Sequence, residues 1–141
     1  MSTYQYKSGL GSAASYQVSG KPFASGSINI DTESSSGTDP FVINFPTVTR
    51  WVNIRNHDAR SDHNVFVAFS KNGLPSQGGS NYFKIPDAGA TTPNSPAFRL
   101  ELKITEIWLE GTSTEADIIA GLTGIETKEI VNNWSGSAGV G

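Results

Sequence analysis

Apolar and polar residues alternate most clearly along FRLELKI, residues 98–104. This period of two is typical of a strand with one face towards a core and the other towards water. Beyond this stretch the apolar residues shift from even-numbered to odd-numbered positions, at Ile107 and Leu109. A one-residue slip near Thr105 and Glu106 therefore predicts a bulge, or a strand that passes from one sheet to another.

Short strand-like runs recur from about Pro22 onwards, separated by breaks rich in Gly, Pro, Asn, Asp and Ser. No stretch holds a helical period over three turns. The spacing predicts an all-β protein, a single antiparallel β-sandwich of about eight strands, and favours a jelly roll among sandwich topologies. The runs are FASGSINI, FVINF, VTRWVNIR, VFVAFS, NYFKI, FRLELKI, EIWLEG and ADIIAGLTGI.

A large apolar set on these runs is expected to form the core. Adjacent members such as Val42 and Ile43 cannot share a face of a regular strand, so one of each pair is expected to serve a loop or an interface. The predicted core is Ile28, Ile30, Val42, Ile43, Phe45, Val48, Trp51, Val52, Ile54, Val65, Phe66, Val67, Phe69, Phe83, Leu100, Leu102, Ile104, Ile107, Leu109, Ile119 and Leu122.

The chain divides into residues 1–21, a Ser/Gly/Tyr-rich N-terminal arm, 22–125, the sandwich domain, and 126–141, a C-terminal tail. We expect both arms to be flexible when no partner is bound. Tyr4 and Tyr6 are spaced to share one face of an extended strand, and tryptophan is favoured at interface hot spots. Tyr4, Tyr6 and Trp134 are therefore predicted to contact another subunit. The alternatives are a disordered N-terminal end and a Trp134 that folds back onto the domain.

Composition narrows the possible functions. The chain of 141 residues fits one domain, and its 36% hydrophobic residues suffice for a core. It has no cysteine, which excludes disulfides and thiolate chemistry. The net charge is -3 with acidic and basic residues interspersed, so no nucleic-acid or membrane partner is predicted. The N-terminus lacks the apolar region of a signal peptide, which indicates a soluble chain made in a cytoplasm.

Both histidines of the chain, His57 and His63, lie in the nearly mirrored stretch RNHDARSDHN between two predicted strands. A hairpin here would place the two imidazoles opposite each other. They could then hold Zn or Cu with Asp58 or Asp62 as a third ligand. No further His or Cys completes a tetrahedral set, so we favour a solvated turn closed by the central arginine. His57 and His63 remain the candidate ligands for a transition metal, and no cofactor is predicted.

Carboxylates offer two further sites, each with a simpler explanation. Glu106 with Glu110, or Glu101 with Asp117, could form a glycosidase pair, although charged residues on an outer strand face explain them more simply. The loop DTESSSGTD presents oxygen ligands for calcium, but its spacing fits no EF-hand. Serine nucleophile elbows and phosphate-binding loops are absent from the sequence. We therefore predict no catalytic residues and no enzymatic activity.

Aromatic residues suggest a glycan platform as the main alternative to a purely structural role. Trp51, Trp108, Tyr82 and Phe83 lie on predicted strands or at their ends. Exposed rings beside polar loops suit sugar binding. We favour the simpler interpretation that Trp51 and Trp108 fill the core.

The phrases FPTVTRWVNIRN, FVAFSKNG, NYFKI, FRLELKITEIWLEG and AGLTGIE resemble small β-sandwich virion proteins. These are minor capsid, vertex or decoration proteins of large DNA viruses and tailed phages, and the resemblance covers residues 45–125. It implies a structural protein located in the virion that binds other capsid proteins and copies of itself. The alternative is a glycan- or ligand-binding sandwich, such as a receptor-binding or adhesin module.

Overall fold

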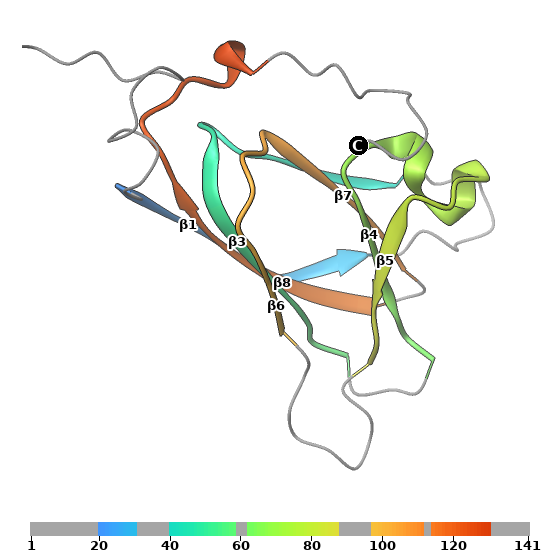
Figure 1. Ribbon diagram of the computed structural model, residues 1–141. Coiled ribbons are helices and arrows are strands. Elements are labelled where there is room, and N and C mark those ends of the chain that lie inside the picture. The colour runs from blue at the N-terminus through green and yellow to red at the C-terminus, as the bar shows by residue number, and fades with distance from the viewer. Residues whose placement is uncertain (1–19, 31–39, 59–61, 88–96, 112–113, 131–141) are drawn as a thin grey trace, which may run out of the picture.

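Two four-stranded antiparallel sheets pack face to face in the computed structural model, which describes residues 20–30, 40–58, 62–87, 97–111 and 114–130 (Figure 1). Sheet A has the order β1-β8-β3-β6 and sheet B the order β2-β7-β4-β5. The predicted all-β sandwich is thereby confirmed. The strands are β1 (Lys21–Ile30), β2 (Phe41–Asn44), β3 (Thr49–Asn56), β4 (Val65–Ala68), β5 (Tyr82–Ile85), β6 (Ala97–Leu100), β7 (Glu106–Gly111) and β8 (Thr114–Leu122).

The strand pairs are nested along the chain. β1 pairs with β8, β2 with β7, β3 with β6 and β4 with β5, all antiparallel. The nested pairs are joined side by side where β3 meets β8 and β4 meets β7. Every pair of consecutive strands except β4 and β5 lies in different sheets. The chain therefore crosses between the layers at almost every connection.

Each predicted run contains one strand, because alternation and turn chemistry are local signals. FRLELKI differs most, since β6 ends at Leu100 and the chain then crosses from sheet A to β7 in sheet B. The crossing is held to β3 by Thr49, whose N–H donates to Ile104 O (3.1 Å) and whose Oγ1 donates to Leu102 O (2.7 Å). Of the two explanations for the parity slip, passage between sheets is the correct one.

Most of the predicted core is buried between the sheets, with two kinds of exception. The prediction that Ile119 belongs to the core was wrong: its side chain points outwards and is 47% exposed, whereas Ile118 is buried. Both follow from strand alternation, because Ile118 pairs with the buried Ile54. The structure also buries apolar residues that the prediction missed, namely Ala68, Leu74, Ile85, Ala116, Ile118, Ala120 and Ile125.

Adjacent apolar residues divide between the two faces as expected. Ile43 is buried and Val42 is only half-buried. Trp51 and Trp108 are also half-buried and lie on the outer faces of sheets A and B, because they alternate with buried residues along β3 and β7. The interpretation that the two tryptophans fill the core was therefore wrong.

The outer face of sheet B is covered by the connection between β4 and β5, which contains the 3-10 turns η1 (Lys71–Gly73) and η2 (Pro75–Gln77). Ala68 points outwards yet is fully buried, and a Cβ added to Gly73 would lie 3.3 Å from Ala68 Cβ. The Ser76 N–H donates to Glu110 Oε2 (3.1 Å) on β7. We call residues 70–79 the cover segment.

The outer face of sheet A differs, because no described segment lies across it (Figure 1). Its outward row through Ile119 continues into Ala24 on β1 and Asn53 on β3. Among the described residues, the structure has no helix long and apolar enough to cross a membrane.

Candidate functional site

His57 and His63 do not face each other across a hairpin. β3 lies in sheet A and β4 in sheet B, so the mirrored stretch crosses between the layers. His57 Nδ1 lies 3.5 Å from Asp117 Oδ2, and His63 Nδ1 lies 3.4 Å from Asp58 Oδ2. The predicted hairpin was wrong because neighbouring strands in the sequence need not pair. Within the described residues, no three His, Cys, Asp or Glu side chains are grouped as metal ligands.

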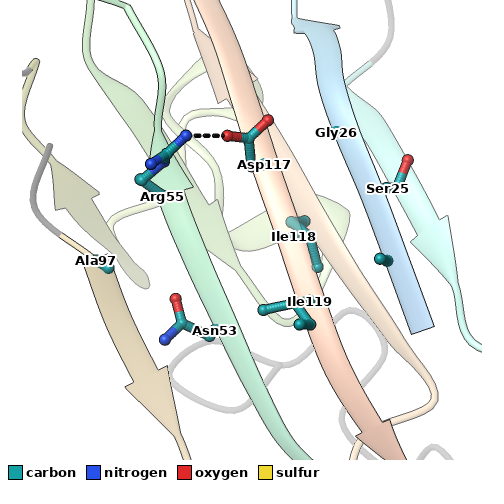
Figure 2. Close-up of a pocket in the computed structure, with 9 residues that line it drawn as sticks. Ser25, Gly26, Asn53, Arg55, Ala97, Asp117, Ile118 and Ile119 are labelled. Carbon is teal, nitrogen blue, oxygen red and sulfur yellow. Dashed lines mark hydrogen bonds and ion pairs between the residues drawn. The ribbon is translucent and has the colours of Figure 1, made fainter. Parts of the chain in front are cut away.

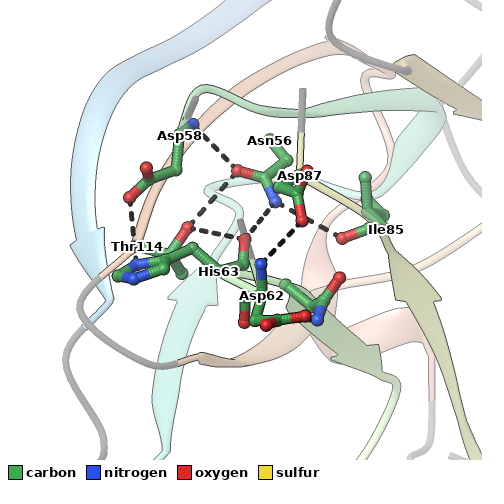
Figure 3. Close-up of polar contacts among 8 residues, drawn as sticks. Asn56, Asp58, Asp62, His63, Ile85, Asp87 and Thr114 are labelled. Carbon is green, nitrogen blue, oxygen red and sulfur yellow. Dashed lines mark hydrogen bonds and ion pairs between the residues drawn. The ribbon is translucent and has the colours of Figure 1, made fainter. Parts of the chain in front are cut away.

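The buried side chain of Asn56 organises this crossing (Figure 3). Its Nδ2 donates to His63 O (2.8 Å) and Ile85 O (3.4 Å). Its Oδ1 accepts from the Asp58 N–H (2.9 Å) and from Thr114 Oγ1 (3.3 Å). One amide thereby links β3, β5, β8 and the crossing, which satisfies polar groups that burial would otherwise penalise. The role of this network is structural.

A shallow hollow of about 270 Å³ lies on the outer face of sheet A (Figure 2). It spans all four strands of the sheet. Small residues leave it open at the edges, and the half-exposed Ile119 lies within it. Its lining is Ala24, Ser25, Gly26, Asn53, Arg55, Ala97, Asp117, Ile118 and Ile119.

Asp117 is the most constrained charged group of the hollow. Arg55 Nη2 lies 2.7 Å from its Oδ2, and the Ser27 N–H donates to its Oδ1 (2.8 Å). Ser27 has a φ of 49°, beside a register shift between Ser25 and Ile28 that directs its N–H towards the carboxylate. Burial raises the pKa of Asp117, but the bonds from Ser27 and Arg55 and the charges of His57 and Arg55 outweigh it. The pKa of Asp117 therefore lies below its ordinary value.

Trp51 lies further along the same face, with the Arg99 guanidinium 4.9 Å from the centroid of its ring. Arg99 Nη2 also lies 2.9 Å from Glu101 Oε1, and Glu101 Oε2 bonds Arg50. The guanidinium occupies one face of the indole, so a sugar could stack only on the other. On sheet B, Trp108 Nε1 donates to Glu106 Oε1 (3.3 Å).

The carboxylates considered as glycosidase pairs take other partners. Glu101 bonds two arginines and Asp117 bonds Arg55. Glu110 accepts the Ser76 N–H from the cover segment. These contacts fit charged residues on outer strand faces.

Several predicted sites lie outside the described residues. These are Tyr4, Tyr6, Trp134 and the loop DTESSSGTD. The predicted partner contacts therefore stay predictions, and the calcium alternative for the loop falls on residues that the structure does not describe.

Sequence reasoning missed two features of the site. Asn56 has the inward parity of the buried Val52 and Ile54, so a polar residue at the end of an apolar alternation was an available signal. The pairing of Arg55 with Asp117 had no signal in the sequence, because the two residues lie on strands whose register is set by the fold.

Comparisons with protein-family models, curated proteins and solved structures found no match to this chain.

Proposed function

We propose that the chain is a non-enzymatic structural protein of a virus particle, a minor capsid, vertex or decoration component built as a jelly roll. It would act in the virion through contacts with other capsid proteins and with copies of itself. The observation that carries the proposal is the nested pairing of first strand with eighth, second with seventh, third with sixth and fourth with fifth. Viral capsid domains are among the common users of jelly rolls.

The chemistry of the described polar residues supports a role through contacts. A fold alone does not specify a function, so the side chains must be considered separately. Asn56 holds the crossing between sheets, and Asp117 holds Arg55 and the bulge of β1. These groups stabilise the sandwich and the surface it presents.

The edges of the sheets are protected from pairing with a strand of another chain, which favours assembly through the sheet faces. The edge strands β2, β5 and β6 have four residues each. Pro40 precedes β2 and Pro86 follows β5, while Pro22 and a bulge interrupt β1. Short strands, prolines and bulges are the devices by which proteins protect sheet edges from pairing with another chain.

Quantitative mass spectrometry of gradient-purified virus particles tests this proposal. We expect the protein at a fixed copy number relative to the major capsid protein, and we expect this ratio to persist after a high-salt wash. Presence in lysates of infected cells but absence from purified particles would contradict the proposed location.

Removing residues 127–141 tests the predicted role of the tail. We expect reduced incorporation into particles, with Trp134→Ala giving the same defect if the tryptophan makes the contact. Trp134→Phe serves as the matched control, because it retains an aromatic ring. Unaltered incorporation of both the truncated chain and Trp134→Ala would rule out this role of the tail.

Binding of a glycan or another small ligand is a second candidate function, favoured by the hollow on sheet A. It combines the apolar Ile119 with polar groups of Asn53, Arg55 and Asp117. Convergent polar groups beside apolar surface are typical of ligand sites. Titrating the full chain with a sugar panel while recording tryptophan fluorescence tests it. Unchanged emission, together with no binding on a glycan array, would remove this candidate.

A further inference from the structure

The outer face of sheet A has an apolar centre that is open to solvent. Ile119 is 47% exposed, although isoleucine is among the residues most often buried. Its row runs through Ala24 and Asn53, and all three residues line the hollow of about 270 Å³. Exposed apolar surface at the centre of a face is what a second copy of the same face can bury.

Charges at the two ends of this face have opposite sign. At one end lie Glu115, Asp117 and Arg55, two carboxylates and one guanidinium, with His57 beside them. The formal charge of these three groups is therefore -1. Their order along the sheet follows from strand register, because Asp117 pairs with Arg55 two residues before Ile119.

The opposite end, beyond Ile119, carries the reverse charge. Arg50 and Arg99 both bond Glu101 there, which makes two guanidiniums and one carboxylate and a formal charge of +1. Arg99 itself pairs with Asn53 in the row of Ile119, but its guanidinium lies over Trp51, whose strand partner Gly121 is two residues beyond Ile119. The basic head groups therefore lie on the far side of the Ile119 row from Asp117.

We propose that the outer face of sheet A is a contact surface between two copies of this chain. The two-fold axis would lie in the plane of the contact, run across the strands and pass through the row of Ile119. That operation places the acidic end of each copy against the basic end of the other and brings the two apolar centres together. A two-fold contact uses the same patch on both subunits, so this patch must complement itself, as its charges do.

This inference rests on the proposed function, because it names the partner and the face through which the chain assembles. The sheet edges are protected and the cover segment lies on sheet B, while Ile119 at the centre of this face is the most exposed large hydrophobic side chain among the described residues. Desolvated apolar centres surrounded by complementary charge are typical of specific protein contacts.

Sedimentation equilibrium of the full chain tests the contact. We expect a reversible dimer that weakens as salt is raised from about 50 mM to about 500 mM, because the end charges are screened. Ile119→Lys places two like charges near the axis and should raise the dissociation constant of the dimer by about tenfold or more. Tyr82→Lys is the matched control on sheet B, since Tyr82 is 39% exposed, and should leave the dimer intact.

A charge swap gives a second, sharper test. Glu115→Lys makes the acidic end basic and Arg99→Glu makes the basic end acidic, so each variant alone should dimerise more weakly than the natural chain. Mixed in equal amounts, they should form a heterodimer, because both contacts between unlike ends are restored. Native mass spectrometry distinguishes the three dimers, since the two substitutions change the chain mass differently. Loss in each variant without recovery in the mixture would contradict the proposed axis.

The outcomes separate this inference from the assembly role. A chain that is monomeric at all concentrations but present in particles would overturn the two-fold contact and leave the virion location standing. A dimer unaffected by Ile119→Lys would overturn the assignment of this face. A monomer whose tryptophan fluorescence responds to a sugar would replace the contact by a ligand site. A salt-sensitive dimer absent from particles would support the contact and contradict the proposed function.

Discussion

The two outer faces of the sandwich differ in how far their apolar surface is covered. Sheet B is covered by residues 70–79 of its own chain, which bury Leu74 and the outward Ala68 completely. Sheet A exposes Ile119 at the centre of its outer face, and no described segment covers it. One sheet therefore buries its outward apolar surface under a segment of its own chain, while the other leaves Ile119 exposed among the described residues.

Topology explains the difference. The connection between β4 and β5 is the one link between described strands that begins and ends in the same sheet, so it can fold back over that sheet. Every connection that leaves a strand of sheet A ends in sheet B. Of these connections, the described segment 101–105 passes from sheet A to sheet B, bonded to Thr49 at the end of β3, and does not fold back over sheet A.

Truncating the anchor of the cover segment should have the largest effect on stability. Leu74→Ala removes a fully buried side chain, and we expect a loss of about 2–5 kcal/mol in the free energy of unfolding, from lost burial and a cavity. Urea denaturation measures it. The matched variant Ile119→Ala, studied at a dilution where the chain is monomeric, should change stability by only about 0.5 kcal/mol. Equal losses in both variants would contradict the contrast between the faces.

Replacing one glycine on each outer face by alanine tests how tightly that face is packed. A Cβ at Gly79 would lie 2.2 Å from Asn72 O and 2.6 Å from Gly73 O, which are backbone atoms. Gly79→Ala should therefore displace the cover segment and cost about 1–3 kcal/mol. At Gly26 on sheet A the nearest atom would be Asp117 Oδ1 at 3.5 Å, an ordinary contact, so Gly26→Ala should cost less than about 0.5 kcal/mol.

Limited proteolysis provides a local measurement for the same glycine pair. Gly79→Ala should accelerate cleavage within residues 70–79, while Gly26→Ala should leave that rate unchanged. A cover segment equally resistant to protease in both variants would show that Gly79 does not control its docking.

The polar link between cover and sheet should contribute less. Glu110→Ala removes the acceptor of the Ser76 N–H, and we expect about 0.5–1.5 kcal/mol of local destabilisation. Amide hydrogen exchange of Ser76 measures this effect directly. Glu106→Ala is the control, since Glu106 accepts from Trp108 on the same strand and does not bond Ser76. Faster exchange in Glu106→Ala alone would reverse the assignment.

On the open face, Asp117→Asn should have the smallest effect, below about 1 kcal/mol near neutral pH, because exposed ion pairs contribute little. The folded-state pKa of Asp117 lies below the value of about 3.9 for an unfolded chain. The carboxylate therefore stabilises the fold above about pH 4, and this contribution disappears as the pH falls through the folded-state pKa.

Denaturant unfolding over a pH series checks this dependence. The stability difference between the natural chain and Asp117→Asn should shrink as the pH is lowered from about 4. Glu115→Gln is the control, because the Glu115 side chain makes no hydrogen bond or ion pair with the described residues. A difference that stays constant between about pH 6 and 2 would contradict the assigned ion pair.

The sequence was sufficient to locate the strands but not to pair them. Alternation at Phe98 to Ile104 and turn residues between runs are local signals, so each run contained a strand. Pairing depends on contacts between distant residues, and proximity in sequence wrongly suggested a hairpin that joined His57 to His63. Two consecutive isoleucines at 118 and 119 leave the parity undefined until Asp117 pairs with Arg55.

The candidate site was predictable only in part. Leu74 is a lone apolar residue in the turn-rich break KNGLPSQGGS, a signal that a connection folds back onto the domain. The opposite charges at the ends of sheet A come from three strands and their ends, β3, β6 and β8, and their arrangement requires the register of β6 and β8 with β3. No local pattern contains that register.

The nested pairing also sets when the protein can fold during its own synthesis. β1 pairs with β8, so Lys21 can pair with Leu122 only after the ribosome has added about 100 further residues. At about 5–20 residues per second, the ribosome needs roughly 5–20 s to supply that partner. Phe23, Ile28 and Ile30 are meanwhile unpaired on the nascent chain, and such strands are prone to aggregation. Slower translation lengthens this exposure, so soluble yield should depend on chaperone supply as much as on final stability.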